Sequence, residues 1–335
     1  MKKFSKVMAT VMAAAMAMSM GACGGSSDPA STQSGVKGDA DGKVYNIGIC
    51  QQLEHPALDS ATEGFQDALK EKLGDNVIFD VQNAQNEQAN AATIANNFVA
   101  NNVDLILANA TTALQCSAAA TTDIPIIGTS VTDYATALQI DDWNGTTGRN
   151  ISGTSDLAPL DEQENMLAEL FPEAKNVAIL YCSAEPNSKF QATNFEKYLD
   201  EDNISYKEFT ASDSNDIGSV VQSAVEYADV IYIPTDNTMA QNTEAINNIT
   251  LPAKVPVVAG EEGICTGCGV ATLSISYYDI GYRAGEMAYE ILVNGADITA
   301  MEIEYAPKVT KEYNKSICEE LGITVPDDYV AIKAE

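Results

Sequence analysis

The stretch Val44–Leu73 constrains the fold most, because it reads as one strand, one loop and one helix in succession. Val44–Cys50 is a short apolar run of strand length. After a polar loop, apolar residues recur at steps of three and four from Leu58 to Leu73, which predicts an amphipathic helix. Pro56 suits the first turn of this helix, since the N–H that proline lacks would have no partner there. The stretch therefore predicts a βα unit.

The pattern continues along the first half of the chain. Strands are expected at 77–81, 103–108 and 123–130, and helices at 85–101 and from about 111 to 120. Strands that are apolar throughout and alternate with helices indicate a parallel sheet that is covered by helices on both faces.

The second half repeats the same order. Asn176–Leu199 parallels the opening unit, with Glu185-Pro186 in its loop. It is followed by apolar or helical stretches at 204–209, 216–227, 228–233 and 254–261. We therefore predict an internal duplication, with two α/β lobes of the same topology.

Each half ends in a strand followed by a helix, and these strands are expected to cross between the lobes as a hinge. The crossing strands are 150–156 and 269–275, and a last segment at 301–313 supplies a third crossing. The first lobe is predicted to hold 44–152 plus about 276–303, and the second about 153–275 plus about 304–335. Open α/β sheets bind ligands outside the carboxyl ends of their strands, so the cleft between the lobes is the expected site.

The first 43 residues are predicted to direct and tether the protein. Residues 1–22 have a basic start and an apolar run that is shorter than the ~20 residues of a membrane span, as in a signal peptide. Met20-Gly21-Ala22-Cys23 resembles a bacterial lipobox, in which Cys23 is lipidated; the alternative is an ordinary cleaved signal with an incidental cysteine. Residues 23–43 are polar and small, as in a flexible tether. We expect an extracytoplasmic protein held to the outer face of the cell membrane by this lipid alone.

Composition excludes several classes of function. The chain has 18 Lys and Arg against 48 Asp and Glu, and such an acidic surface repels nucleic acid. Cys265 and Cys268 have the spacing of a redox or half-zinc motif, but His55 is the single histidine, so neither a zinc site nor any other metal or cofactor is expected. A disulfide between these two cysteines is left open.

Several short motifs, in order, resemble the tryptophan/tyrosine-type substrate-binding lipoproteins of ABC importers. The resemblance runs from Val44 to about Tyr329. It implies a type I periplasmic-binding-protein fold that closes around an aromatic amino acid. One departure is Ser276, where the family more often has Asp, so a carboxylate for the ligand ammonium is missing there. The motifs are 54–59, 83–85, 132–133, 153–156, 185–188, 234–238 and 260–263.

An amino-acid ligand requires donors for its carboxylate, acceptors for its ammonium group and apolar walls for its side chain. Thr111/Thr112 and Asn187/Ser188 lie at predicted helix starts, where free N–H groups and the helix dipole favour an anion. The alternative is that these residues are plain helix N-caps.

Asp236 and Glu261 directly follow apolar strands and are the predicted ammonium ligands; the alternative is that they are solvated acids. Asp156 is expected to bind ligand or to hold the hinge. His55 is expected to contact the ligand or to bond the backbone at a helix start, and Tyr277 to form an aromatic wall. The predicted site is completed by Glu54, Thr132, Glu185, Thr235, Asn237 and Ser276.

We therefore expect a monomeric solute receptor that closes by a hinge and passes an aromatic amino acid to an ABC permease. The permease and its ATPase are expected on separate chains, because no GxxxxGK[ST] pattern occurs here. A sugar, a nucleoside or another signalling molecule in the same fold is the alternative. An enzyme is not expected, since adjacent carboxylates such as Glu261 and Glu262 point in different directions and no G-x-S-x-G elbow is present.

Overall fold

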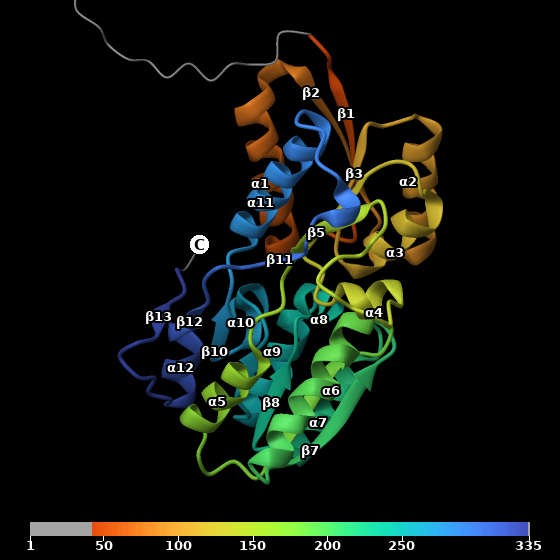
Figure 1. Cartoon of the computed structure of the whole chain (residues 1–335). Helices are drawn as coiled ribbons and strands as arrows, with labels where there is room; N and C mark the ends of the chain where they lie inside the picture. The colour runs from red at the N-terminus through yellow and green to blue at the C-terminus, as the bar shows by residue number, and fades with distance from the viewer. Residues whose placement is uncertain (1–41, 334–335) are drawn as a thin grey trace, which may run out of the picture. The chain divides into compact units, whose positions relative to one another are not determined.

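The computed structural model describes residues 42–333 and contains two β-sheets, each flanked by helices (Figure 1). The predicted signal peptide, Cys23 and most of the tether lie outside the described residues. The first sheet has the order β2–β1–β3–β4–β5–β11 and comprises β1 Tyr45–Gln51, β2 Val77–Asn83, β3 Leu105–Asn109, β4 Ile126–Thr129, β5 Ile151–Ser155 and β11 Glu304–Tyr305. The second has the order β7–β6–β8–β9–β10–β12–β13 and comprises β6 Asn176–Cys182, β7 Ser205–Ala211, β8 Val230–Ile233, β9 Val257–Ala259, β10 Ala271–Ser274, β12 Thr310–Tyr313 and β13 Val330–Ala331.

The predicted duplication is confirmed, because β1–β5 and β6–β10 have the same order within their sheets. In each sheet the direction of strand addition reverses once, between β1 and β3 and between β6 and β8. Ligands of open α/β sheets bind at the carboxyl ends of the strands beside such a reversal. A ligand site is therefore expected at the loops that follow these four strands.

The second sheet is not parallel throughout, contrary to the prediction. β12 runs antiparallel to β10, with Ala271 opposite Tyr313 and Ser274 opposite Thr310. The reason is the path of the chain: β10 leaves the sheet at the end where β12 later enters it. The other pairs of the first five strands in each sheet are parallel, as predicted.

Helices cover both faces of each sheet. On the first sheet, α1 and α11 cover one face through residues such as Phe65 and Met287, and α2 and α3 cover the other through Phe98 and Leu114. On the second, α7, α9 and α10 form one layer and α5, α6 and α12 the other. Within residues 42–333, none of the helices is long and apolar enough to cross a membrane. The helices are α1 Pro56–Leu73, α2 Gln88–Ala100, α3 Thr111–Ala120, α4 Tyr134–Leu138, α5 Leu160–Leu170, α6 Pro186–Glu201, α7 Ile217–Tyr227, α8 Asn237–Gln241, α9 Thr243–Ala253, α10 Glu262–Cys268, α11 Tyr277–Leu292 and α12 Lys315–Leu321, with 3₁₀ turns at Gly74–Asn76 and Ile298–Ala300.

Helices α1 and α11 pack so closely that their backbones touch. A Cβ added at Gly281 would lie 2.0 Å from the carbonyl oxygen of Ala61, and one at Gly64 would lie 2.2 Å from that of Tyr278. No larger residue fits at these positions without a shift of backbone. Because His55 precedes α1 and Tyr277 begins α11, this contact fixes the spacing of two predicted site residues.

Three irregular segments connect the two sheets: 156–159, 275–276 and 306–309. The first three residues of β5 pair with β4 and its last two pair with β11, so the boundaries expected at 152/153 and 303/304 fall inside the first sheet. Strands β5 and β11 stay paired with each other up to their last residues, and only the segments that follow them pass to the second sheet. The division into lobes at these segments, with a hinge there, stays a prediction.

Candidate functional site

Polar side chains are buried at the carboxyl ends of the strands in both sheets. They include Thr132 and Asp156 in the first sheet and Glu185, Asp236 and Glu261 in the second, each at most 5% exposed. Burial of a charged or polar group is costly unless it is paired. The alternative that Asp236 and Glu261 are solvated acids is therefore wrong, and the hydrogen bonds of each residue show what it does.

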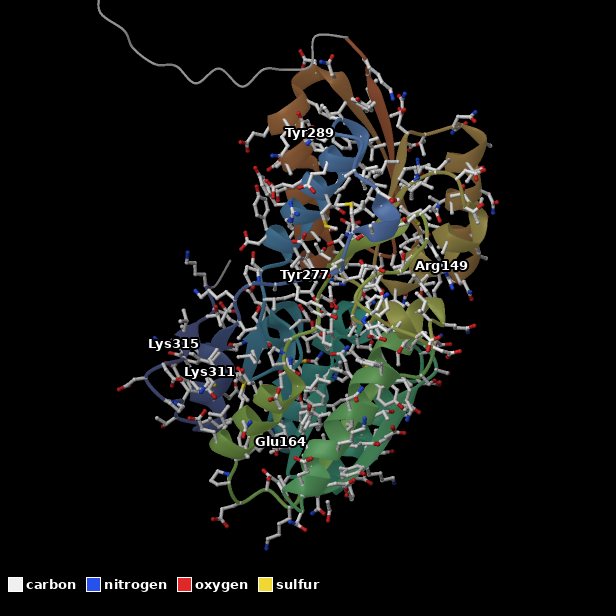
Figure 2. All side chains as sticks on the ribbon, in the orientation of Figure 1. Arg149, Glu164, Tyr277, Tyr289, Lys311 and Lys315 are labelled. Carbon is white, nitrogen blue, oxygen red and sulfur yellow. The ribbon has the colours of Figure 1, made fainter. Side chains whose placement is uncertain are left out.

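Asp156 lies in a small cluster of hydroxyl groups. The Thr132 hydroxyl donates to Asp156 Oδ1 over 2.9 Å, and the Tyr277 hydroxyl donates to Oδ2 over 3.1 Å. Tyr277 lies at the start of α11, directly after the second segment between the sheets (Figure 2). Burial raises the pKa of Asp156 to about 6, the two hydroxyls lower it, and the nearby Glu261 carboxylate raises it further. No Lys or Arg is among the groups that shift this pKa.

Glu261 caps helix α10 with its side chain. Gly263 N–H donates to Oε2 over 2.7 Å, and Ile264 N–H donates to Oε1. Burial raises the pKa of Glu261, while the His55 ring and these N–H groups lower it. Two buried carboxyl groups, those of Asp156 and Glu261, thus flank the Tyr277 side chain, whose hydroxyl pKa both of them raise.

Asp236 and Glu185 hold the first turn of α8. Asp236 accepts the N–H groups of Cys182 at 2.7 Å and Met239 at 2.8 Å. Glu185 accepts the backbone N–H groups of Asn237 at 3.0 Å and Thr238 at 2.8 Å, together with their side chains. Burial and the neighbouring Glu185 raise the pKa of Asp236 to about 8. Both acids, which the sequence assigned to the ligand, are engaged in the structure with α8.

The residues for which capping was the alternative are not caps. Thr111 and Thr112 lie in the first turn of α3, whose N-cap is Ala110, and Asn187 and Ser188 lie in the first turn of α6, whose N-cap is Glu185. In neither helix does the N-cap side chain accept a backbone N–H group. The first N–H groups of both helices are thus left without a side-chain acceptor, which is the arrangement that binds anions.

The two sheets are joined by polar contacts near α8. His55 Nε2 and Asn237 Oδ1 share a hydrogen bond of 3.2 Å, and Asn86 Nδ2 donates to Thr238 Oγ1 over 3.0 Å. His55 is the N-cap residue of α1 but makes no capping bond with its side chain, so the alternative of a backbone-bonded helix start is wrong. Its ring instead forms a hydrogen bond with Asn237, which follows β8 of the second sheet.

Four buried polar atoms without a hydrogen-bond partner among residues 42–333 lie at, or in the loops after, the carboxyl ends of β1, β3 and β4. They are Gln52 Oε1, His55 Nδ1, Asn109 Oδ1 and Ser130 Oγ. Sequence reasoning missed Gln52, Asn109 and Ser130 as site residues. The available signal was their place at the end of an apolar strand, the same position that led to the prediction of Thr111, Thr112, Asn187 and Ser188.

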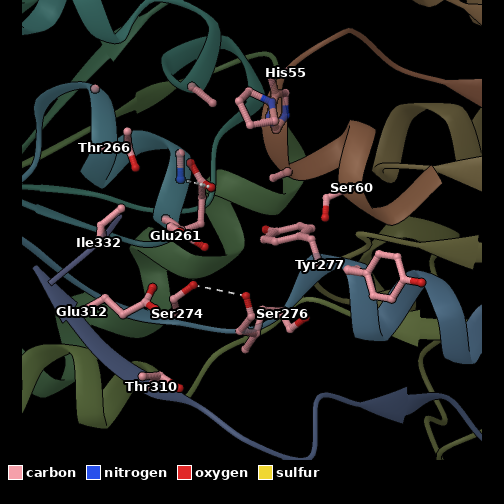
Figure 3. Close-up of a pocket in the computed structure, with 18 of the residues that line it drawn as sticks. His55, Ser60, Glu261, Thr266, Ser274, Ser276, Tyr277, Thr310, Glu312 and Ile332 are labelled. Atoms are coloured by element: carbon pink, nitrogen blue, oxygen red, sulfur yellow. Dashed lines mark hydrogen bonds between the residues drawn. The ribbon is translucent and has the colours of Figure 1, made fainter. Parts of the chain in front are cut away.

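His55, one of these four residues, lines a cavity of about 580 Å³ (Figure 3). The cavity brings together four of the predicted residues, His55, Glu261, Ser276 and Tyr277. Ser276 is exposed and caps α11 by accepting the N–H of Asp279. Glu54 is exposed and lines a separate hollow next to Gln51, so the structure does not place it at this cavity.

The two cysteines that have the spacing of a redox or half-zinc motif are not bonded to each other in the structure. Cys265 and Cys268 are free thiols buried in α10, and burial raises the pKa of both. In the stretch from 42 to 333, no group of three or more His, Cys, Asp or Glu side chains is arranged to hold a metal ion. The arrangement is one of hydrogen-bonding groups around a cavity, suited to holding a small polar molecule.

Comparison with known proteins gives a consistent match. A family model described as ABC transporter substrate binding protein matches residues 46–335. A protein of Clostridioides difficile (strain R20291) described as a tyrosine-binding protein is 38% identical over 253 residues, 75% of this chain and 73% of that one.

Solved structures are similar over most of the chain. An ABC domain from Streptococcus pneumoniae in complex with L-Trp is 32% identical, with a TM-score of 0.81, and covers 85% of this chain and 97% of its own. The ligand-free, open structure of a substrate binding protein from Clostridium difficile is 34% identical, with a TM-score of 0.67, and covers 87% and 100%. The fold is thus closer to that of the L-Trp complex than to that of the open protein, although both are similarly distant in sequence.

Proposed function

The chain belongs to the family of ABC transporter substrate-binding proteins, and we propose that it binds an aromatic α-amino acid between its two sheets and delivers it to an importer. Its two domains have the type I periplasmic-binding-protein fold, as the sequence predicted. Proteins of this family bind solutes outside the cytoplasm and are not enzymes. Two relatives at 38% and 32% identity are described with tyrosine and with L-Trp, which supports an aromatic ligand.

The observation that carries the proposal is the pair of buried carboxyl groups beside the Tyr277 hydroxyl. Asp156 and Glu261 each raise the pKa of Tyr277, and Glu261 raises that of Asp156. Like charges buried together are stabilised by a cation between them. The α-ammonium group of an amino acid supplies that charge and up to three hydrogen-bond donors.

The ligand carboxylate would bind at the uncapped N-termini of α3 and α6. Thr111, Thr112, Asn187 and Ser188 lie there, and their helices have N–H groups without a side-chain acceptor. An anionic end at the helix starts and a cationic end at the acids match the zwitterion of an α-amino acid better than a neutral sugar.

Outside the binding site, the receptor would have a membrane anchor and partner chains. Lipidation of Cys23 would anchor it to the outer face of the membrane, and the permease and ATPase would be separate chains. Closure about the segments at 156–159, 275–276 and 306–309 would follow from ligand contacts to both sheets, because a ligand shifts a two-state equilibrium by its differential affinity.

A thermal-shift screen tests the proposal. Residues 43–335 are unfolded and refolded to remove bound solutes and then screened with amino acids, sugars and nucleosides. A selective rise of the melting temperature with Trp, Tyr or Phe is expected, since a ligand at about 100 times its Kd stabilises by ~2.7 kcal/mol. A response to a sugar or nucleoside, with none to any amino acid, would refute the ligand assignment.

A further inference from the structure

The cavity has a polar floor made by β10 and β12. Ser274, Thr310 and Glu312 line it, and Figure 3 shows them gathered on the side of the pocket away from His55. In the antiparallel ladder, Ser274 lies opposite Thr310 and Thr272 lies opposite Glu312. Residues directly opposed in such a ladder, and those two positions further along, present their side chains on one face. These four residues, called the polar floor below, therefore form one patch.

The polar floor contains two buried oxygens without a partner in the described part of the chain, Glu312 Oε2 and Thr272 Oγ1. Thr272 is fully buried. The Ser274 hydroxyl donates to the carbonyl oxygen of Ile275 over 3.1 Å. Burial raises the pKa of the Glu312 carboxyl group, and the Ser274 hydroxyl lies close enough to lower it. Buried polar atoms in proteins almost always have a hydrogen-bond partner, so two such atoms without one on the same patch require an explanation. A carboxylate oxygen in this state is a hydrogen-bond acceptor that awaits a donor.

The opposite end of the cavity also carries an unpaired polar atom. His55 is 7% exposed, lines the cavity and has no partner for Nδ1. Between this end and the polar floor, the walls include apolar groups from Pro56, Ile275 and Ile332 and the ring of Tyr277. Apolar walls between polar ends fit an elongated ligand with an apolar middle.

We propose that Glu312 determines which aromatic amino acid the protein binds, by accepting a hydrogen bond from a donor at the far end of the ligand's ring. This inference rests on the proposed function, in which the ligand ammonium lies near Glu261 and Tyr277. The side chain then extends toward the polar floor. Ligands with a ring O–H or N–H, such as tyrosine and tryptophan, satisfy Glu312, and phenylalanine does not.

Phenylalanine is discriminated against because it would leave the Glu312 carboxylate without a hydrogen-bond donor. Its ring would displace water from Glu312 and give no hydrogen bond in return, so a charged acceptor would lose its solvation without compensation. Sites built to bond a ligand hydroxyl reject analogues that lack it far more strongly than apolar pockets reject a missing methylene. Because the cavity is open to solvent at one side, we expect a factor of at least ~10 rather than the larger factors of closed sites.

Calorimetry on the refolded protein, residues 43–335, tests the inference with four ligands: tyrosine, tryptophan, phenylalanine and O-methyltyrosine. Tyrosine and tryptophan are expected to bind at least ~10-fold more tightly than phenylalanine. O-methyltyrosine keeps the ring oxygen but has no donor, so it should behave like phenylalanine. This comparison needs no variant.

The variant Glu312→Leu removes the acceptor while keeping a side chain of similar size. Tyrosine affinity should fall by about 10-fold while phenylalanine affinity stays unchanged or rises. The control Glu319→Leu removes an exposed carboxylate of α12 and should leave the ratio of the two affinities unchanged. If Glu312→Leu does not fold, Glu312→Gln, which retains one acceptor oxygen, should keep part of the preference for tyrosine.

The outcomes separate this inference from the proposed function. Equal affinity of the unaltered protein for tyrosine, phenylalanine and O-methyltyrosine would overturn the role of Glu312 and leave an aromatic amino-acid receptor. Equal weakening of tyrosine and phenylalanine by Glu312→Leu would do the same. Absence of binding by every aromatic amino acid would refute the proposed function itself.

Discussion

Two buried aspartates show how the same residue type takes different roles. Asp156 accepts hydrogen bonds from two side-chain hydroxyls, those of Thr132 and Tyr277. Asp236 accepts from two backbone N–H groups, those of Cys182 and Met239. A hydroxyl can rotate toward another acceptor when a cation arrives, whereas a backbone N–H of a folded helix start cannot. Asp156 is therefore the better candidate for exchanging partners with a ligand. Asp236 holds α8 as Glu261 holds α10, and what distinguishes Glu261 is that it also lines the cavity.

The substitution Asp156→Asn should stabilise the ligand-free protein and weaken binding. A carboxyl group whose pKa is raised from about 3.9 in the unfolded chain to about 6 in the fold binds its proton more tightly when folded. The free energy of unfolding therefore falls as the pH rises from about 4 to about 6, and the full cost, on the order of 3 kcal/mol, is present at pH 7. Asn removes this cost, while the ligand ammonium loses a charged acceptor and affinity falls ~10-fold or more.

Urea unfolding between pH 4 and pH 8, with calorimetry at pH 7, measures both effects. Ser155→Ala is a matched control, since among residues 42–333 the neighbouring Ser155 hydroxyl bonds only the Thr132 carbonyl and the Leu157 N–H, and it carries no charge. An unchanged affinity in Asp156→Asn would remove this residue from the site.

At the scale of elements, the pair α1 and α11 positions the site. The chain enters α1 from His55 and α11 from Tyr277, and both side chains line the cavity. Gly64 and Gly281 let the two helix backbones touch. Helix α8 has a similar role across the sheets, because Glu185 holds its first turn where Asn237 and Thr238 meet His55 and Asn86.

The substitution Gly281→Ala should force α1 and α11 apart. Its Cβ would lie 2.0 Å from the Ala61 carbonyl oxygen, which belongs to backbone and cannot rotate away. We expect a loss of about 1–3 kcal/mol in the free energy of unfolding, the usual cost of overpacking, together with weaker ligand binding. Urea unfolding and calorimetry measure these effects.

Gly218→Ala in α7 is the control for this prediction. Nothing lies within 4 Å of a Cβ at Gly218, and the residue is exposed. Alanine there should be neutral or should stabilise the helix by about 0.5–1 kcal/mol. Equal stability of Gly281→Ala and the unaltered protein would contradict the packing argument.

At the scale of the whole molecule, the ligand is expected to act on the relation between the two sheets. Asp156 directly follows β5 of the first sheet, Glu261 follows β9 of the second sheet, and both would face the ammonium group. A ligand that contacts both sides favours the state in which they are close.

Small-angle X-ray scattering should therefore show a lower radius of gyration when tyrosine is added to the refolded protein. Asp156→Asn at the same tyrosine concentration, below its weakened Kd, should show no change. A radius of gyration that is the same with saturating tyrosine would count against hinge closure, although not against binding.

Much of the fold could be predicted because its signals are local. Apolar runs without helical period gave the positions of β1–β10 to within a few residues, and steps of three and four gave the long helices. The short helices α4 and α10 carry too few turns to show a period and were not predicted. The antiparallel β12 was not predicted either, since its direction depends on where the chain re-enters the sheet.

The site was predicted less completely, for a physical reason. The motifs of the family resemblance included Thr132 and Asp156, and Tyr277 was predicted as an aromatic wall; the structure joins these three residues by hydrogen bonds. Asp236 and Glu185 were predicted as site residues too. The sequence could not show that they hold α8, because the number of N–H groups that a carboxylate accepts is a property of the folded loops and not of the local sequence.

The sequence by itself determined the duplicated α/β architecture, the acidic character and the family, because these follow from short-range patterns of residue type. Only the tertiary structure decided which polar residues hold helices and which remain without partners around the cavity. Hydrogen-bond satisfaction depends on groups distant in the chain: Tyr277 and Asp156 are 121 residues apart, and Thr272 and Glu312 meet only through the pairing of β10 with β12. That pairing places Glu312 at the cavity, where it is the proposed determinant of ligand specificity.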